Sequence, residues 1–120
     1  MTASEVVIAD CHSFPDEGVF FIENSERPNI CLGRDEFHTP EELLDLVKGH
    51  FEDCGFSVLV NQPYSGCMIP IDYYRKNKHV HGIMIEVNKR LYLDRGFEKA
   101  KGFGKIRRAI TDILKETRMY

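Results

Sequence analysis

One acidic residue interrupts the most apolar stretch of the sequence. Glu86 lies within His81–Val87, a run that is otherwise apolar enough on both faces to form a central strand of a sheet. An ionised carboxylate in such a place costs several kcal/mol unless it is paired. Glu86 is therefore either a general base beside a metal-bound water or a structural carboxylate held by Lys89, Arg90 or a backbone amide.

A histidine flanked by polar side chains is the second candidate. His12 stands between Asp10 and Ser13, and an imidazole can bind a metal through one nitrogen while a neighbouring carboxylate fixes its tautomer. The alternative is a polar loop histidine that binds nothing. His12 and Glu86 together favour a hydrolytic metal site more than either residue does alone.

The remaining histidines and the cysteines are weaker candidates. His38, His79 and His81 are not assigned to a metal, because they can equally be polar surface residues. A pair between Cys11 and His12 is not expected, since adjacent side chains of an extended segment point apart. The sequence has no Cys-x-x-Cys pair of the kind that binds structural zinc. Reduced thiols are therefore expected at all four cysteines, Cys11, Cys31, Cys54 and Cys67.

Short apolar runs should form the sheet that positions these residues. The predicted strands are Glu5–Ala9, Asn29–Leu32, Phe56–Val60 and His81–Val87. Open α/β sheets bind ligands in loops beyond the carboxyl ends of their strands. We therefore expect Asp10–Pro15 and Asn61–Gly66 to be loops at one sheet edge that carries the site.

Two helices are predicted to cover the sheet. The first begins with Thr39 as its cap and Pro40 at its first position, and ends at Gly55. The second starts near Gly104 and has a basic outer side. Its apolar face is predicted to comprise Ile106, Ile110, Ile113, Leu114 and Thr117.

The other connections read as loops and turns. Asp16–Pro28 is predicted to be a loop, and Asn88–Asp94 a helix or turn. The expected fold is a three-layer α/β domain spanning residues 1–120, with a short, mostly parallel or mixed sheet flanked by helices.

Length and charge exclude several classes of protein. The 120 residues are enough for one core but not for two, and the net charge of −3 gives no bulk attraction for nucleic acid or anionic membranes. No apolar run approaches the roughly 20 residues that cross a bilayer, and the first residues lack a secretion signal. A cytoplasmic protein is expected.

Three segments, taken in order, resemble the N-formylglutamate amidohydrolase family. They are Asp10–Pro15 (Asp-Cys-His-Ser-Phe-Pro), Asn61–Gly66 (Asn-Gln-Pro-Tyr-Ser-Gly) and Ile85–Asp94 (Ile-Glu-Val-Asn-Lys-Arg-Leu-Tyr-Leu-Asp). The resemblance spans residues 5 to 95 and is to the C-terminal half of the family. It implies a partial phosphorylase/hydrolase-like fold, similar to zinc carboxypeptidases and aspartoacylases.

The resemblance implies a role for each matching residue. His12 would be a ligand of one zinc ion, and Glu86 the catalytic acid/base. The loop residues Asn61 and Tyr64 would lie near the substrate. Lys89 is a further substrate-binding candidate. Asp10 and Asn88 would lie behind these residues and hold them in position. The implied reaction is zinc-dependent deformylation of an N-acyl amino acid, whose carboxylates need a cation such as Arg34, Arg75 or Lys89.

The sequence departs from the family pattern in three respects. Cys67 replaces the second glycine of a Gly-Gly turn, and Lys89 stands where an arginine usually follows the asparagine. The other two zinc ligands of the family belong to an N-terminal half that this sequence does not contain. The chain could therefore be a non-catalytic relative, or could act as a homo-oligomer or with a separate N-terminal half.

Overall fold

The computed structural model describes residues 5–16 and 27–119. Their strands form one mixed sheet of four strands in the order β1-β4-β2-β3, with bounds Val6–Phe14 (β1), Ile30–Gly33 (β2), Val58–Val60 (β3) and Val80–Asn88 (β4). β4 lies centrally, parallel to β1 and antiparallel to β2, while β2 and β3 are parallel. The predicted α/β class and mixed sheet are confirmed.

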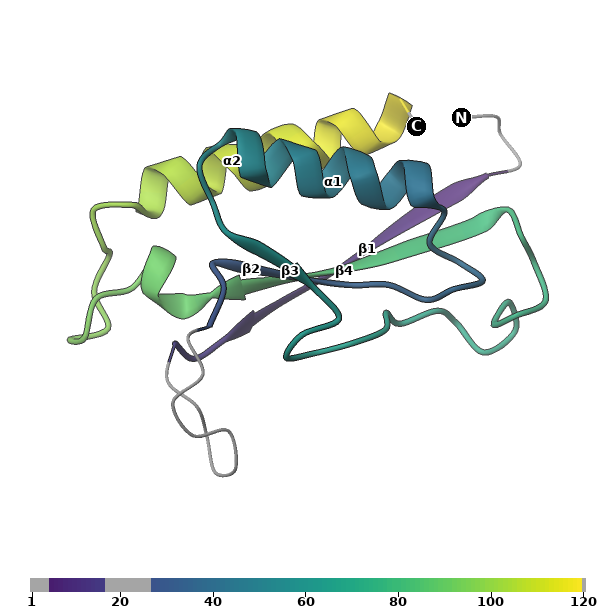
Figure 1. The fold of residues 1–120 in the computed structure, drawn as a ribbon, viewed down its shortest axis with the longest axis horizontal. Coiled ribbons are helices and arrows are strands. Elements are labelled where there is room, and N and C mark those ends of the chain that lie inside the picture. Colours follow the sequence, from purple (N-terminus) through teal and green to yellow (C-terminus); the bar gives the residue numbers. More distant parts are fainter. Residues whose placement is uncertain (1–4, 17–26, 120) are drawn as a thin grey trace.

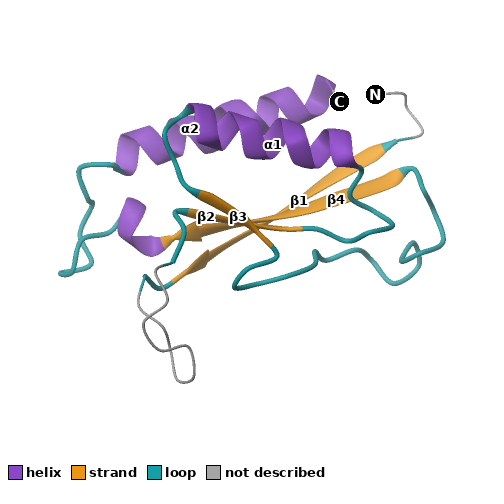
Figure 2. Cartoon of the chain, in the orientation of Figure 1, coloured by secondary structure: helices purple, strands orange, loops and turns teal. Residues whose placement is uncertain are grey.

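Both long helices cover the same face of the sheet (Figure 1). They are α1 (Glu41–Asp53) and α2 (Phe103–Glu116). The described residues also form two short 3-10 helices, η1 (Lys89–Leu91) and η2 (Thr117–Met119). The connection between β3 and β4, residues 61–79, crosses the other side as loop (Figure 2). The described residues therefore place a loop where a third, helical layer was expected.

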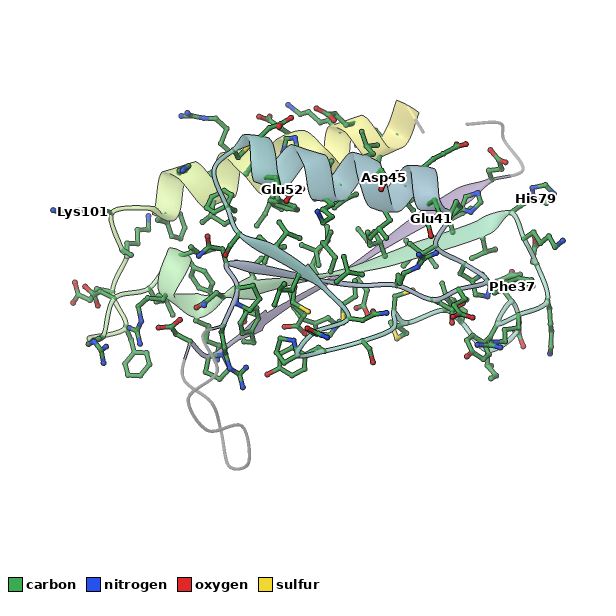
Figure 3. The ribbon with its side chains drawn as sticks, in the orientation of Figure 1. Phe37, Glu41, Asp45, Glu52, His79 and Lys101 are labelled. Carbon is green, nitrogen blue, oxygen red and sulfur yellow. The ribbon has the colours of Figure 1, made fainter. Side chains whose placement is uncertain are left out.

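Alternation along β4 separates the two faces of the sheet. Ile83, Ile85 and Val87 are buried in the core beneath the helices. The four core residues of α1 recur at helical spacing and are Leu43, Leu44, Val47 and Phe51. Each such side chain contributes about 1.5 to 3 kcal/mol by leaving water. The opposite side of α1 carries Asp45 and Glu52, both exposed (Figure 3).

The ends of the helices differ in part from the prediction. Gly55 follows α1 with a φ of 90°, as expected of a helix terminator. The predicted cap is wrong, because the Thr39 hydroxyl donates to the carbonyl of Gly82 and leaves the helix without a side-chain cap. In α2, Ile106 and Ile113 are buried, but Leu114 is 37% exposed and does not belong to the core face.

The first strand is longer than predicted. β1 continues to Phe14, so Asp10–Phe14 is part of the sheet and not a loop beyond its end. The reason is pairing with β4, which runs in register from Val6 with Val80 to Phe14 with Asn88. Long-range pairing thus overrides the local polar signal. The loop predicted at Asp16–Pro28 lies mostly outside the described residues, and none of the described helices is long and apolar enough to cross a membrane.

Candidate functional site

The two main candidate residues lie side by side on the face of the sheet away from the helices. His12 of β1 and Glu86 of β4 are direct partners in the parallel register. Paired residues of neighbouring strands point to the same face, with backbones roughly 5 Å apart. The fold therefore brings together two residues that are 74 positions apart in the sequence. They occupy the open face of the sheet, and not loops beyond strand ends.

Asp10 orients the imidazole of His12. Its Oδ1 lies 2.7 Å from Nε2 of His12, and its Oδ2 accepts the backbone N–H of Met68 at 3.1 Å. An ionised carboxylate can only accept, so in the neutral imidazole Nε2 carries the proton and Nδ1 keeps its lone pair. The His12 side chain is 50% exposed, whereas that of Asp10 is 13% exposed. Nδ1 of His12 therefore has the electronic form that a metal ligand requires.

Glu86 combines burial with an unsatisfied oxygen. The residue is 8% exposed, and its Oε2 is buried without a hydrogen-bond partner in residues 5–16 and 27–119. Burial raises the pKa of Glu86 above its ordinary value, while nearby His12 lowers it and Asp10 raises it further. A carboxyl group with a raised pKa can hold and release a proton nearer to neutral pH than an exposed one can.

Cys31 and Tyr64 form the wall next to Glu86. Cys31 pairs with Glu86 across the antiparallel strands β2 and β4, and its thiol donates to the carbonyl oxygen of Tyr64 at 3.2 Å. Burial raises the pKa of Cys31. A thiol with a raised pKa is a poor thiolate nucleophile or metal ligand at neutral pH. This arrangement places the Tyr64 loop against the candidate site.

Asn61 shapes the loop that carries Tyr64. Its side-chain oxygen accepts the backbone N–H groups of Arg34 at 2.9 Å and of Gly66 at 3.3 Å, and its backbone has a φ of 59°. Asparagine tolerates this left-handed conformation better than most residues. Asn61 thus holds the turn in place, and contact with substrate remains a prediction for both Asn61 and Tyr64.

Asn88 and Lys89 lie at the carboxyl end of β4. Asn88 is 2% exposed, and its amide donates to Oδ1 of Asp16 and to the carbonyl of Pro28. Lys89 is exposed and lines a hollow of about 220 Å³ together with Asp16 and other residues beyond the strand. Asn88 therefore ties together the chain around the site, while Lys89 faces a separate hollow.

The described residues offer only part of a metal site. Within residues 5–16 and 27–119, no three histidine, cysteine, aspartate or glutamate side chains gather closely enough to hold a metal ion. The Asp10 and His12 pair suits one ligand position. A structural or catalytic zinc ion needs at least three protein ligands. The residues present therefore do not fit a complete zinc site.

A larger hollow lies on the other face of the sheet. It measures about 440 Å³ and is lined mainly by apolar side chains of α2 and of the sheet, with Cys11 and Ser13 on its β1 side. His12 also borders this hollow, but Glu86 does not line it. The hollow and the buried carboxylate thus belong to different sides of the sheet.

A histidine and a buried glutamate thus lie paired across the mixed sheet of an α/β domain. The chain belongs to the N-formylglutamate amidohydrolase family, because the family model matches residues 2–93. The resemblance drawn from three short segments is thereby confirmed. No curated protein sequence matches the chain.

Two solved structures share the fold. The N-formylglutamate amidohydrolase from Ralstonia eutropha JMP134 superimposes with a TM-score of 0.75 at 23% identity, covering 92% of this chain and 42% of that one. A bacteriophage poly-gamma-glutamate hydrolase gives a TM-score of 0.55 at 13% identity, covering 93% and 53%. The chain thus spans about half or less of either structure.

Proposed function

We propose that this chain provides part of the active site of a zinc-dependent amidohydrolase that releases formate from N-formylglutamate or a similar N-acyl amino acid. The observation that carries the proposal is the register pair of His12 and Glu86. A buried carboxylate oxygen that has no partner in the described part of the chain lies beside an oriented imidazole. Family membership supports the reaction class.

The proposed roles follow from the state of each side chain. Glu86 would accept a proton from the attacking water and donate it to the leaving nitrogen as the carbon–nitrogen bond breaks. Asp10 would keep the Nδ1 lone pair of His12 available for a metal. One zinc ion, when bound, would supply a Lewis acid and lower the pKa of its water to ~7.

The remaining ligands would come from a second polypeptide segment, which is either another copy of the chain or a separate N-terminal half. The position of His12 supports this proposal, because β1 is one of the two edge strands and its outer edge pairs with no strand in the described ranges. An unpaired edge can accept a further strand. That strand would lie beside the half-exposed imidazole of His12.

Formate release from N-formylglutamate tests the proposal. Wild-type chain supplied with zinc should release formate, and Glu86→Gln should be slower by about 10²- to 10⁴-fold, the usual contribution of a general acid/base. The assay should be repeated over a range of protein concentrations, because a site shared between copies gains activity on association. Wild-type chain without activity at every concentration, with zinc present, would favour the alternative of a non-catalytic relative that acts as a binding domain.

A further inference from the structure

An arginine beside the candidate site has no acidic partner among the residues that the structure describes. The guanidinium carbon of Arg27 lies 5.8 Å from the ring centre of Phe14 and 5.8 Å from that of Tyr64. Its Nη1 donates to the Tyr64 hydroxyl at 3.0 Å. Its Nε is buried without a hydrogen-bond partner, and no carboxylate in the described part of the chain forms an ion pair with it.

Both aromatic contacts connect Arg27 to the His12 and Glu86 pair. Phe14 follows His12 by two positions in β1 and therefore lies on the same face of the sheet. Tyr64 lies against Cys31, the strand partner of Glu86. The two rings are 5.7 Å apart. They restrict the guanidinium to a place next to the open face.

An anionic substrate would need a cation on this face of the sheet to bind it. Asp10 and Glu86 are acidic, and a substrate carboxylate would be repelled by them. A guanidinium binds a carboxylate with two parallel hydrogen bonds, and Arg27 still has donors to offer. We propose that Arg27 is the residue that binds the substrate carboxylate, which for its substrate class rests on the amidohydrolase function proposed above.

The three cations considered from the sequence are less suitable. Lys89 lines the separate hollow beyond the carboxyl end of β4. The guanidinium of Arg34 donates to Glu41 and to the carbonyl of Thr39. Arg75 is exposed, and its backbone N–H donates to His38, whose ring also contacts the carbonyl of Val80 at the start of β4. Glu86 lies roughly 20 Å further along that strand, since each residue adds about 3.3 Å.

Binding measurements with two probes test the role of Arg27. N-formylglutamate and its diamide, in which both carboxylates are amides, are titrated into wild-type chain, Arg27→Gln and Arg27→Lys by calorimetry. Wild type should prefer the dicarboxylate, and Arg27→Gln should bind it about 10- to 100-fold more weakly while its affinity for the diamide stays unchanged. Arg27→Lys, which keeps the charge but not the paired donors, should fall between them.

Arg75→Gln is the matched control. Arg75 also lies over a tyrosine ring, at 5.5 Å from the centre of Tyr74, and its Nε donates to that hydroxyl. This variant should bind like wild type. Thermal unfolding of each variant separates lost binding from lost folding.

The outcomes separate this inference from the proposed reaction. An Arg27-dependent preference for the dicarboxylate without formate release would support the carboxylate site and count against the enzyme. Formate release with an unchanged KM in Arg27→Gln would overturn the role of Arg27 and leave the reaction standing. Equal binding of both probes by wild type, or no binding of either, would also overturn the inference.

Discussion

Alternate residues of β4 have opposite effects on the stability of the chain. On the helix side of β4, Ile83 and Ile85 are at most 1% exposed and meet the helices in a fully apolar core. On the other side, Glu86 is also buried, yet it carries a carboxylate oxygen that nothing in the described residues satisfies. The first face stabilises the fold, and the second contains a group whose burial costs stability. That contrast is typical of a functional site.

Truncation on the helix side should give the largest change. Ile85→Ala leaves a cavity beneath the helices, and we expect it to lower the free energy of unfolding by about 2 to 5 kcal/mol. Urea denaturation followed by circular dichroism measures this loss. A change below ~1 kcal/mol would mean that the helices are not packed on Ile85 as described.

The open face depends on close contact between a loop and the sheet. A Cβ added at Gly33 would lie 2.0 Å from the carbonyl oxygen of Gly66 and 2.6 Å from Met84. Gly33→Ala should therefore displace the loop of Tyr64 and destabilise the chain by about 1 to 3 kcal/mol, measured by the same urea titration.

Gly49→Ala is the control for this loop prediction. Gly49 lies within α1, and a Cβ there would meet nothing within 4 Å. The variant should be more stable than wild type by about 0.5 to 1 kcal/mol, because alanine favours the helix. Equal effects of the two substitutions would contradict the contact between the loop and β2.

Removing the buried charge should have a small effect on stability, opposite in sign to the effects of Ile85→Ala and Gly33→Ala. Burial raises the folded-state pKa of Glu86 above its ordinary value of 4.5. The stability that the protonated group allows is complete below the ordinary pKa and is lost as the pH rises through the folded pKa, because the folded chain must then ionise a buried group. In the metal-free chain at neutral pH, Glu86→Gln should be more stable by about 1 kcal/mol.

The pH dependence makes this prediction specific. The gain should shrink as the pH falls from the raised folded-state pKa toward the ordinary value of 4.5, and should be absent below about 4, where the carboxyl group is protonated in both states. Urea midpoints of both proteins in the presence of a chelator, taken across this range, measure the difference. A gain independent of pH would show that lost strain, and not lost charge, stabilises the variant.

Sequence patterns predicted the central elements because their signals are local. The apolar run around Glu86 and the helical spacing from Leu43 to Phe51 were sufficient for β4 and α1. The extension of β1 through His12 was missed, because it depends on pairing with β4. Helix capping by Thr39 was predicted wrongly, since its hydroxyl binds a distant carbonyl instead.

The candidate site was predictable only where motifs mark it. His12 and Glu86 were found from residue type and from a family resemblance, and the structure places them side by side. Arg27 had no such signal, because it lies in a polar segment whose neighbours give no periodicity. Only the fold reveals its contacts with Phe14 and Tyr64.

Zinc content of the purified chain, measured by elemental analysis, tests the division between the two faces most directly. Adjacent residues provide the comparison, because both border the hollow beneath α2 but only His12 is the strand partner of Glu86. The account predicts zinc bound to wild-type chain and to Cys11→Ala, and lost from His12→Ala. Zinc that persists in His12→Ala, or that is lost from Cys11→Ala instead, would contradict it, and a wild-type chain that takes up no zinc when incubated with it would contradict a site completed by a second copy of the chain.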